Sequence, residues 1–243
     1  MDPRESVKGK IVVVTGATGG LGRVVVRRLL EADAVVAAVY RDEAGFRSLE
    51  TSVGGMAEFL QGFRADVTVE AEVQALVADV VRRYGRIDAL LNLVGTYCGG
   101  TEVAGTSESD WDLLIRTNLT SAFLCSRAVL PVMTSAASGR IVSVAARPAV
   151  EKKGRAKSGA YAVSKAGVVI LTETIAEEAK RFGVTANCIV PGTIDTPKNR
   201  SEISGGDASK WADPREIADV LLFLVSDASS VISGAAIPVY GAS

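Results

Sequence analysis

The sequence predicts an α/β fold of one domain, built on a doubly wound parallel sheet. Short apolar runs rich in Val and Ile alternate along the chain with longer segments of helical periodicity. Continuous apolar strands joined by crossover helices are typical of a parallel sheet that is covered on both faces. The length of 243 residues suits one large domain with a full core, and the sequence contains no linker, internal repeat or low-complexity tract.

Seven segments are expected to form strands. Their apolar residues are nearly continuous, which indicates burial on both faces of the sheet. In chain order they are residues 10–16, 34–40, a stretch within 57–67, 86–95, 139–145, 184–192 and 234–240. Because Pro238 in the last segment lacks a backbone donor, we expect that strand to lie at an edge of the sheet or to end early.

Five segments between these strands show the spacing of amphipathic or buried helices. They are residues 21–32, 69–85, 109–133, 159–183 and 213–226. Gly85 is placed to end the second helix at its C-cap, and Pro214 is placed in the first turn of the last. Right-handed crossovers between parallel strands then produce the doubly wound, Rossmann-like arrangement.

Two segments interrupt the alternation of strands and helices. Residues 148–158 are polar and basic, and residues 193–212 carry Thr, Ser, Gly and Asp between the sixth strand and the last helix. Loops at the carboxyl ends of parallel strands are where such folds bind ligands. We therefore expect residues 193–212 to form a mobile substrate loop.

Composition narrows the class of protein. The formal net charge of −1 gives no reason to expect nucleic acid or an anionic membrane as partner. The polar start offers no signal-peptide core, and the run VLLFLV is too short to span a bilayer. Three dispersed cysteines without CxxC spacing indicate free thiols in the cytoplasm. The absence of histidine excludes the common metal and triad chemistries, and we predict no metal site.

A glycine-rich loop, TGATGGLG at residues 15–22, joins the first expected strand to its helix. Gly16 permits a tight turn, and Gly20 and Gly22 allow the backbone to approach a pyrophosphate at the helix N-terminus. The spacing is G-x-x-x-G-x-G instead of the usual G-x-G-x-x-G. By itself the loop predicts only nucleotide binding, and a glycine-rich turn without a ligand is the alternative.

The segment YAVSK sets Tyr161 and Lys165 four residues apart, on one face of the expected helix. The pair is either ordinary packing or a proton donor with a neighbouring cation. A phenol has an ordinary pKa of about 10, and a close ammonium favours the phenolate. If the pair is functional, we expect Lys165 to lower the pKa of Tyr161 toward a working pH.

Together, TGATGGLG and YAVSK resemble the short-chain dehydrogenase/reductase family, and the resemblance covers nearly the whole chain. The segments DVT at 66–68, NLVG at 92–95 and PGTIDT at 191–196 follow in the family's order. The resemblance implies hydride transfer between a nicotinamide cofactor and a small carbonyl or alcohol. It implies Tyr161 as the acid/base, Lys165 as its modulator and Asn118 as support for a water-linked proton path.

The resemblance also implies a set of cofactor-binding residues and an oligomer. Homodimers or homotetramers in this family form through the two long helices, here around residues 107–131 and 159–182. The implied cofactor-binding residues are Gly16, Thr18, Gly20, Leu21, Gly22, Arg41, Asp66, Val67, Asn92, Tyr161, Lys165, Pro191, Ile194 and Thr196.

One departure from the family pattern concerns the serine that normally ends the fifth strand and helps to hold the substrate oxygen. Counting from Gly139 places Ala146 there, followed by Arg147. An oxyanion donor typically contributes on the order of 100-fold or more to the rate. Three explanations stand. A hydroxyl comes from elsewhere, the substrate is a conjugated imine or quinonoid that needs less help, or the protein is a dinucleotide-binding sensor with little turnover. The candidate hydroxyls are those of Ser143, Ser158 and Thr193.

The second explanation has support from a further resemblance. The segments IDTPKNR at 194–200 and SGAAIPV near the end, with Trp211 between them, are similar to dihydropteridine reductases, which reduce a quinonoid pterin without the serine. A charged surface lid is the alternative interpretation of residues 194–200.

The end of the second strand bears on the choice of cofactor. NAD-binding proteins of this fold carry an acidic residue there, and NADP-binding proteins an arginine nearby. Tyr40 occupies the acidic position and Arg41 follows, so NADP(H) is favoured over NAD(H). Pairing of Asp42 with Arg41 would weaken this preference, and Gly19 stands where many NADP-binding relatives have a basic residue.

Overall fold

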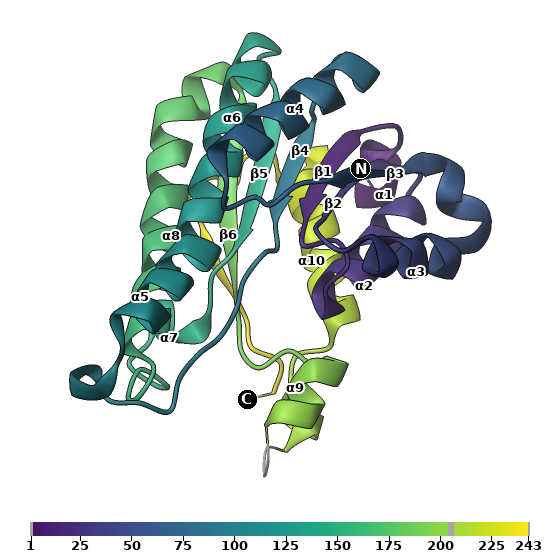
Figure 1. Ribbon diagram of the computed structural model, residues 1–243. Helices are drawn as coiled ribbons and strands as arrows, with labels where there is room; N and C mark the ends of the chain where they lie inside the picture. The colour runs from purple at the N-terminus through teal and green to yellow at the C-terminus, as the bar shows by residue number, and fades with distance from the viewer. Residues whose placement is uncertain (1, 204–206, 243) are drawn as a thin grey trace.

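The computed structural model describes residues 2–203 and 207–242. A parallel sheet of seven strands in the order β3-β2-β1-β4-β5-β6-β7 forms its centre (Figure 1). The strands are β1 (Ile11–Thr15), β2 (Val35–Tyr40), β3 (Leu60–Arg64), β4 (Ala89–Asn92), β5 (Gly139–Val144), β6 (Val184–Pro191) and β7 (Ala236–Val239). The predicted α/β fold with a doubly wound, Rossmann-like sheet is confirmed.

Helices cover both faces of the sheet (Figure 1). One layer contains α1 (Pro3–Val7), α2 (Gly20–Leu30), α3 (Glu43–Val53) and α10 (Pro214–Val225), and the other contains α4 (Glu70–Tyr84), α6 (Ser121–Ser135) and α8 (Gly159–Ala179). Strand β1 shows why the runs are continuously apolar. Val12 and Val14 pack with the first layer, whereas Val13 packs with the second, and all three are buried. Alternate residues of one strand therefore supply both halves of the core.

The expected helix over residues 109–133 is interrupted. Helix α5 (Glu108–Leu114) passes into a π-helical turn, Ile115–Thr120, before α6 begins. Such a turn is rare and frequently lies at a functional site. Here it holds Asn118, which is buried.

Helix α3 was not predicted, although its signals are in the sequence. Asp42 caps it by accepting a hydrogen bond from the Gly45 amide at 2.8 Å, and Phe46, Leu49 and Val53 bury its inner face. Short helices α7 (Arg147–Val150) and α9 (Pro197–Glu202) lie at the two segments that interrupt the pattern.

The expected ends of several elements are confirmed. Gly85 ends α4 in the left-handed conformation with φ 75°, and Pro214 begins α10 behind the cap residue Asp213. Pro238 lies in β7, which is an edge strand of the sheet. In the part of the chain that the structure describes, no helix is long and apolar enough to cross a membrane.

The sheet order reverses between β1 and β4, which is the point where folds of this kind bind their ligands. The segments that follow β4, β5 and β6 all leave the sheet at its carboxyl end, where α5, α7 and α9 gather (Figure 1). The glycine loop after β1 opens at the same end. The segments that carry the candidate residues therefore lie at the carboxyl end of the sheet.

Candidate active site

The glycine loop lies at the switch point and packs tightly against its surroundings. Gly16 has φ +67°, and a Cβ added there would lie 3.1 Å from the Val94 amide nitrogen in the loop after β4. A Cβ at Gly22 would lie 2.1 Å from the Gly16 carbonyl oxygen. Side chains at these two positions would therefore push the loop away from α2, which explains the requirement for glycine.

The start of α2 is suited to an anion. Its N-cap residue Gly19 provides no side-chain hydrogen bond, and the first turn contains no acidic residue. Neither a capping side chain nor an acidic residue of the first turn therefore neutralises the first amides of the helix and the positive end of its dipole. A dinucleotide pyrophosphate fits this arrangement.

Two further residues of the loop play supporting roles. Leu21 packs, partly buried, against the core on the α2 side of the sheet. The carbonyl oxygen of Thr18 accepts a hydrogen bond from Arg23 Nε at 3.0 Å. Both contacts fix the path of the backbone around the space in front of α2.

The loop after β6 closes against the glycine loop. A Cβ at Gly20 would lie 3.0 Å from Thr196 Cβ, although the two residues are far apart in the sequence. Thr196 is buried, and its hydroxyl caps α9 by accepting from the Asn199 amide at 3.2 Å. Pro191 is the buried last residue of β6, and Ile194 forms a parallel bridge with Ala212. The structure therefore brings Thr196 against the glycine loop, with Pro191 and Ile194 in the same segment.

The predicted substrate loop, residues 193–212, is fastened at its base. Asp195 donates its amide proton to the Ala212 carbonyl at 2.9 Å, and the Ala212 amide donates to the Thr193 carbonyl at 2.8 Å. Residues 204–206 of this segment lie outside the described residues. Its mobility stays a prediction.

The pair Tyr161 and Lys165 lies in the first turns of α8, as the spacing predicted. Lys165 is buried at 4 % exposure, and its Nζ donates a hydrogen bond to the Val144 carbonyl at the end of β5, at 2.7 Å. A Cβ at Gly95, in the loop after β4, would lie 3.1 Å from that Nζ and 3.2 Å from Asn118 Oδ1. The missing side chain at Gly95 thus leaves a shared space in which the ammonium and the amide oxygen face each other.

The expected lowering of the Tyr161 pKa is wrong for this structure. Burial, with a smaller contribution from the neighbouring Tyr97, raises the pKa of Tyr161 to about 12. Burial lowers the pKa of Lys165 to about 8. The physical reason is that desolvation disfavours the charged form of both groups, and the Lys165 ammonium is directed to the Val144 carbonyl.

Asn118 clamps the backbone of Thr96. Its Oδ1 accepts from the Thr96 amide at 2.8 Å, and its Nδ2 donates to the Thr96 carbonyl at 3.0 Å. The same Nδ2 donates to Ser164 Oγ at 3.0 Å, and that hydroxyl donates to the Tyr161 carbonyl at 2.8 Å. Both protons of the amide are used, while Oδ1 retains one lone pair toward the Gly95 side. Asn118 therefore ties the loop after β4 to the first turns of α8.

Asn92 is placed differently from the other predicted cofactor-binding residues. It is buried in β4, and its Nδ2 lies 3.2 Å from both Ser126 Oγ and Ser143 Oγ. Its side chain therefore connects β4 and β5 to α6. Its Oδ1 is buried without a hydrogen-bond partner among the described residues.

Ala146 lies two residues beyond the end of β5, where it is buried and precedes α7; its equivalence with the family's serine stays a prediction. Of the three candidate hydroxyls, that of Ser143 lies within hydrogen-bond distance of Asn92 inside the sheet. The Ser158 hydroxyl donates to the carbonyls of residues 154 and 155. Thr193 lies partly buried at the end of β6. Two of the three hydroxyls are thus engaged in structural contacts.

Arg41 lies at the end of β2 with a side chain that is 75 % exposed. Its partner is Asp66, with NH1 and Oδ2 3.7 Å apart, and not Asp42, which caps α3. The pairing with Asp42 that would have weakened the preference for NADP(H) is therefore not found among the described residues. Tyr40 occupies the strand end where NAD-binding proteins have an acidic residue. Its hydroxyl donates a hydrogen bond to Glu43 Oε2 at 2.7 Å.

Asp66 and Val67 follow β3 as expected. Asp66 Oδ1 accepts from the Thr68 amide at 2.9 Å and the Thr68 hydroxyl at 2.8 Å, which shapes the turn. The side chain of Val67 is buried in the core, so only its backbone is available to a ligand.

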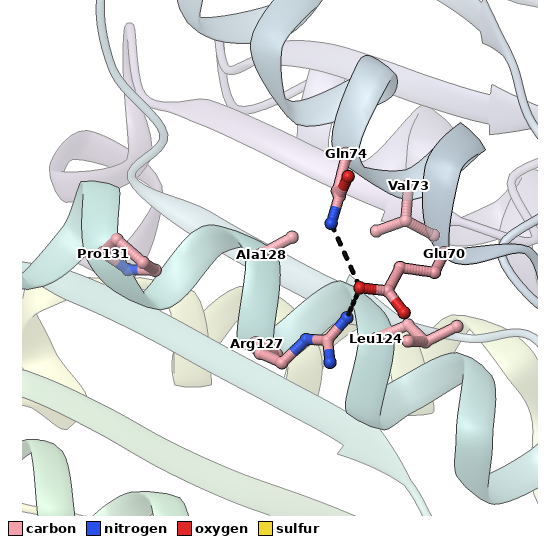
Figure 2. A pocket seen from close by; sticks show the side chains of 7 residues that line it. All are labelled: Glu70, Val73, Gln74, Leu124, Arg127, Ala128 and Pro131. Atoms are coloured by element: carbon pink, nitrogen blue, oxygen red, sulfur yellow. Dashed lines mark hydrogen bonds and ion pairs between the residues drawn. The ribbon is translucent and has the colours of Figure 1, made fainter.

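A separate pocket between α4 and α6 encloses about 170 Å³. Figure 2 shows Glu70 within it, bonded to Gln74 and paired with Arg127. This pocket lies on the outer face of the helices and not at the carboxyl ends of the strands, so we assign it no part in the site. Among residues 2–203 and 207–242, no group of three or more Cys, Asp or Glu side chains is arranged to hold a metal ion.

Tyr97 is the site residue that the sequence analysis missed. Its ring meets the Tyr161 ring edge to face, with centroids 5.0 Å apart and planes at 85°. An aromatic residue two positions beyond NLVG, followed by two glycines, is the signal that was available.

Comparison with known proteins identifies the family of the chain. The family model described as short chain dehydrogenase matches residues 10–205. The chain is 32 % identical to (2S)-[(R)-hydroxy(phenyl)methyl]succinyl-CoA dehydrogenase subunit BbsD of Thauera aromatica, over 97 % of this chain and 96 % of that protein. It is 31 % identical to 3-oxoacyl-[acyl-carrier-protein] reductase FabG of Thermotoga maritima, over 97 % and 98 %.

A solved structure of a short-chain dehydrogenase/reductase from Burkholderia xenovorans superposes with a TM-score of 0.91 at 33 % identity, covering 98 % of this chain and 97 % of the other. The fold, the ordered motifs and these relatives lead to one conclusion. The chain belongs to the short-chain dehydrogenase family and is an NAD(P)-dependent oxidoreductase.

Proposed function

We propose that the protein transfers hydride between NADP(H) and a small carbonyl or alcohol substrate, with Tyr161 as the acid/base. The observation that supports the proposal is that Lys165 Nζ and Asn118 Oδ1 border the same space at Gly95, with Tyr161 one helical turn before Lys165 on α8. A bound nicotinamide supplies or accepts the hydride.

The side chains have distinct tasks in this proposal. In reduction, the Tyr161 hydroxyl donates its proton to the substrate oxygen while hydride reaches the carbonyl carbon, so that C=O becomes CH–OH. Burial raises the pKa of Tyr161 to about 12, so the phenol is protonated at neutral pH and is a weaker acid than it would be in water. Lys165 and the free lone pair of Asn118 Oδ1 face the space at Gly95, where a water chain would return the proton.

NADP(H) is the proposed cofactor because of Arg41. Its guanidinium is exposed and, among the described residues, is held by one long ion pair. A planar guanidinium can bind a 2′-phosphate with two parallel hydrogen bonds, whereas the ribose hydroxyl of NAD gives it no charge to pair with.

Ala146 influences which substrates the site can reduce. Without a hydroxyl there, the developing negative charge on the substrate oxygen has one donor fewer. Conjugated imine and quinonoid substrates place less of that charge on a single oxygen and need less support. The compound in the name of the relative BbsD has a phenyl group on the carbon that bears the hydroxyl, whereas FabG is named for a 3-oxoacyl group. The resemblance to dihydropteridine reductases remains a prediction.

The second candidate function is a dinucleotide-binding sensor with little turnover. Ala146 favours it, since the loss of an oxyanion donor can abolish useful catalysis while leaving the glycine loop intact.

Cofactor-oxidation assays separate the two functions. The purified protein is tested with NADPH and NADH against a panel of ketones, quinones and a quinonoid pterin, with Tyr161→Phe as the matched variant. We expect turnover that Tyr161→Phe lowers by roughly 100-fold or more, in line with the usual size of general acid catalysis. Because Tyr161 is also among the implied cofactor-binding residues, cofactor dissociation constants are measured for both proteins, and the loss of turnover should exceed any loss of cofactor affinity. Tight cofactor binding with no turnover of any substrate would favour the sensor.

We also propose that the protein is a homodimer or homotetramer in the cytoplasm. Exposed apolar side chains on α5, α6 and α8 support an interface there. They are Trp111, Leu113, Phe123, Val163 and Ile170. The cysteines are all free, which supports a reducing compartment. Light scattering on the purified protein tests the oligomeric state.

A further inference from the structure

We propose that Tyr97 forms an aromatic wall of the substrate site and selects planar, conjugated substrates over puckered ones of the same size. The inference rests on the proposed function, because it assumes that substrate meets Tyr161. It extends that function by naming the class of substrate. Its evidence is a rigid loop that presents an exposed aromatic ring beside the proposed acid/base.

The loop after β4 is held rigidly on both sides of Tyr97. Asn118 holds both backbone groups of Thr96, with distances of 2.8 Å and 3.0 Å. Three residues beyond Tyr97, the Gly100 amide donates to the Lys157 carbonyl at 2.7 Å. Gly100 has φ +95°, a conformation that a residue with a side chain rarely adopts. Tyr97 is therefore held between two fixed points.

The ring of Tyr97 packs against the backbone of its own loop at Gly99. A Cβ added at Gly99 would lie 2.2 Å from the Tyr97 hydroxyl oxygen and 2.6 Å from its Cζ. The hydroxyl end of the ring consequently lies against the backbone at Gly99, and a side chain there would displace the ring. The pair of glycines after Cys98 thus shapes the loop around the aromatic ring.

The ring of Tyr97 also lies next to the proposed acid/base, Tyr161. Tyr97 contacts Tyr161 edge to face at 5.0 Å between centroids, yet the residue is 64 % exposed. An aromatic residue fixed in this way leaves much of its surface open beside the phenol. A substrate whose oxygen meets the Tyr161 hydroxyl must also pass close to that open surface. Aromatic rings prefer flat partners in offset or edge-to-face contact.

The aromatic wall at Tyr97 and the missing hydroxyl at Ala146 favour the same kind of substrate. The site lacks a hydroxyl where the substrate oxygen would need one, which already favours conjugated substrates. Conjugated substrates are planar, so an aromatic wall and an absent hydroxyl select the same chemical class. The two features come from different strands and loops, and they are independent observations.

The experiment compares matched planar and puckered molecules. Catalytic efficiency is measured with acetophenone and with cyclohexyl methyl ketone for wild type, Tyr97→Phe and Tyr97→Leu. Phe59→Leu is the control, since Phe59 is an exposed aromatic residue next to β3 at the far edge of the sheet. Binding is measured by calorimetry at saturating NADP⁺ with unreactive 2-naphthamide and its fully hydrogenated analogue. The binding arm does not depend on turnover.

We expect Tyr97→Leu to lower the planar-to-puckered ratio roughly 2- to 12-fold, the range that an aromatic contact contributes. Tyr97→Phe and Phe59→Leu should keep the ratio of the wild type. An equal loss for both ketones and both amides would overturn the inference, because it would mean that Tyr97 only supports the loop. If no ketone is reduced but Tyr97→Leu still removes the preference for 2-naphthamide, the proposed function fails while the aromatic wall stands.

Discussion

The charge of Arg41 leads to a prediction about cofactor choice that can be worked from the structure. The substitution is Arg41→Ala. The guanidinium is 75 % exposed, and its NH1 lies 3.7 Å from Asp66 Oδ2. An exposed pair at this distance contributes no more than about 1 kcal/mol, so NADPH can draw Arg41 away from Asp66 at little cost.

The gain on binding is larger than that cost. A hydrogen bond to a charged group contributes about 1.5–3 kcal/mol. After subtraction of the pair with Asp66, Arg41 should favour the 2′-phosphate by about 1–2 kcal/mol, which corresponds to roughly 5- to 30-fold in affinity. Arg41→Ala should therefore weaken NADPH binding by that factor. Binding of NADH should change by less than about twofold, as for an ordinary surface substitution.

Fluorescence titration of reduced cofactor measures both dissociation constants without a substrate. The control is Arg82→Ala, because Arg82 is 73 % exposed and also paired with an aspartate, but lies near the end of α4. The difference between the two cofactors should shrink as salt is raised, since exposed charges are screened. Equal weakening of NADPH and NADH, or no weakening of NADPH, would refute the assignment of Arg41.

Three further predictions concern the site and its support. Ala146→Ser should raise the rate with an unconjugated ketone on the order of 10-fold or more, because an oxyanion donor can contribute on the order of 100-fold; no gain in a steady-state assay would count against the alignment of Ala146 with the missing serine. Gly22→Ala should lower the free energy of unfolding by about 1–3 kcal/mol and weaken cofactor binding, since the new Cβ would lie 2.1 Å from a carbonyl oxygen. Gly55→Ala, where a Cβ meets nothing within 4 Å, is the control in thermal melts, and equal melting temperatures would contradict the packing argument. Lys165→Met should be more stable than wild type at pH 7. Burial lowers the Lys165 pKa from 10.5 to about 8. Between these two pH values the amine is protonated in the unfolded chain but neutral in the folded one, so the free energy of unfolding rises with pH. The wild type should therefore regain about 3 kcal/mol of stability as the pH rises from 8 to 10.5. Urea denaturation at pH 7 to 10.5 should show the gap closing, and a constant gap would mean that the amine is not desolvated.

The sequence by itself determined the architecture and the main chemical groups. Apolar runs specified the inner strands, because burial on both faces leaves a continuous apolar signal that short-range reading can detect. The edge strands β3 and β7 are only partly buried and carry a weaker signal. The glycine loop and the Tyr161–Lys165 spacing are also local, since each depends on one turn or one helical face. These motifs were found at the predicted places.

Helix α3 and the π-helical turn at Asn118 show where local reading was insufficient. The first was overlooked although its cap and apolar spacing are present in the sequence. The second could not be predicted, because a π turn continues the helical pattern with one extra residue and changes only which face each side chain occupies. That change directs Asn118 onto Thr96.

Only the tertiary structure decided the electrostatics and the contacts between distant segments. The pKa of Tyr161 depends on burial and on Tyr97, and neither follows from the four-residue spacing to Lys165. Arg41 pairs with Asp66 across adjacent strands instead of with its neighbour Asp42. Thr196 meets Gly20 because parallel strands bring their carboxyl ends to one edge of the sheet. Desolvation and charge pairing depend on distance in space, which a linear pattern does not contain.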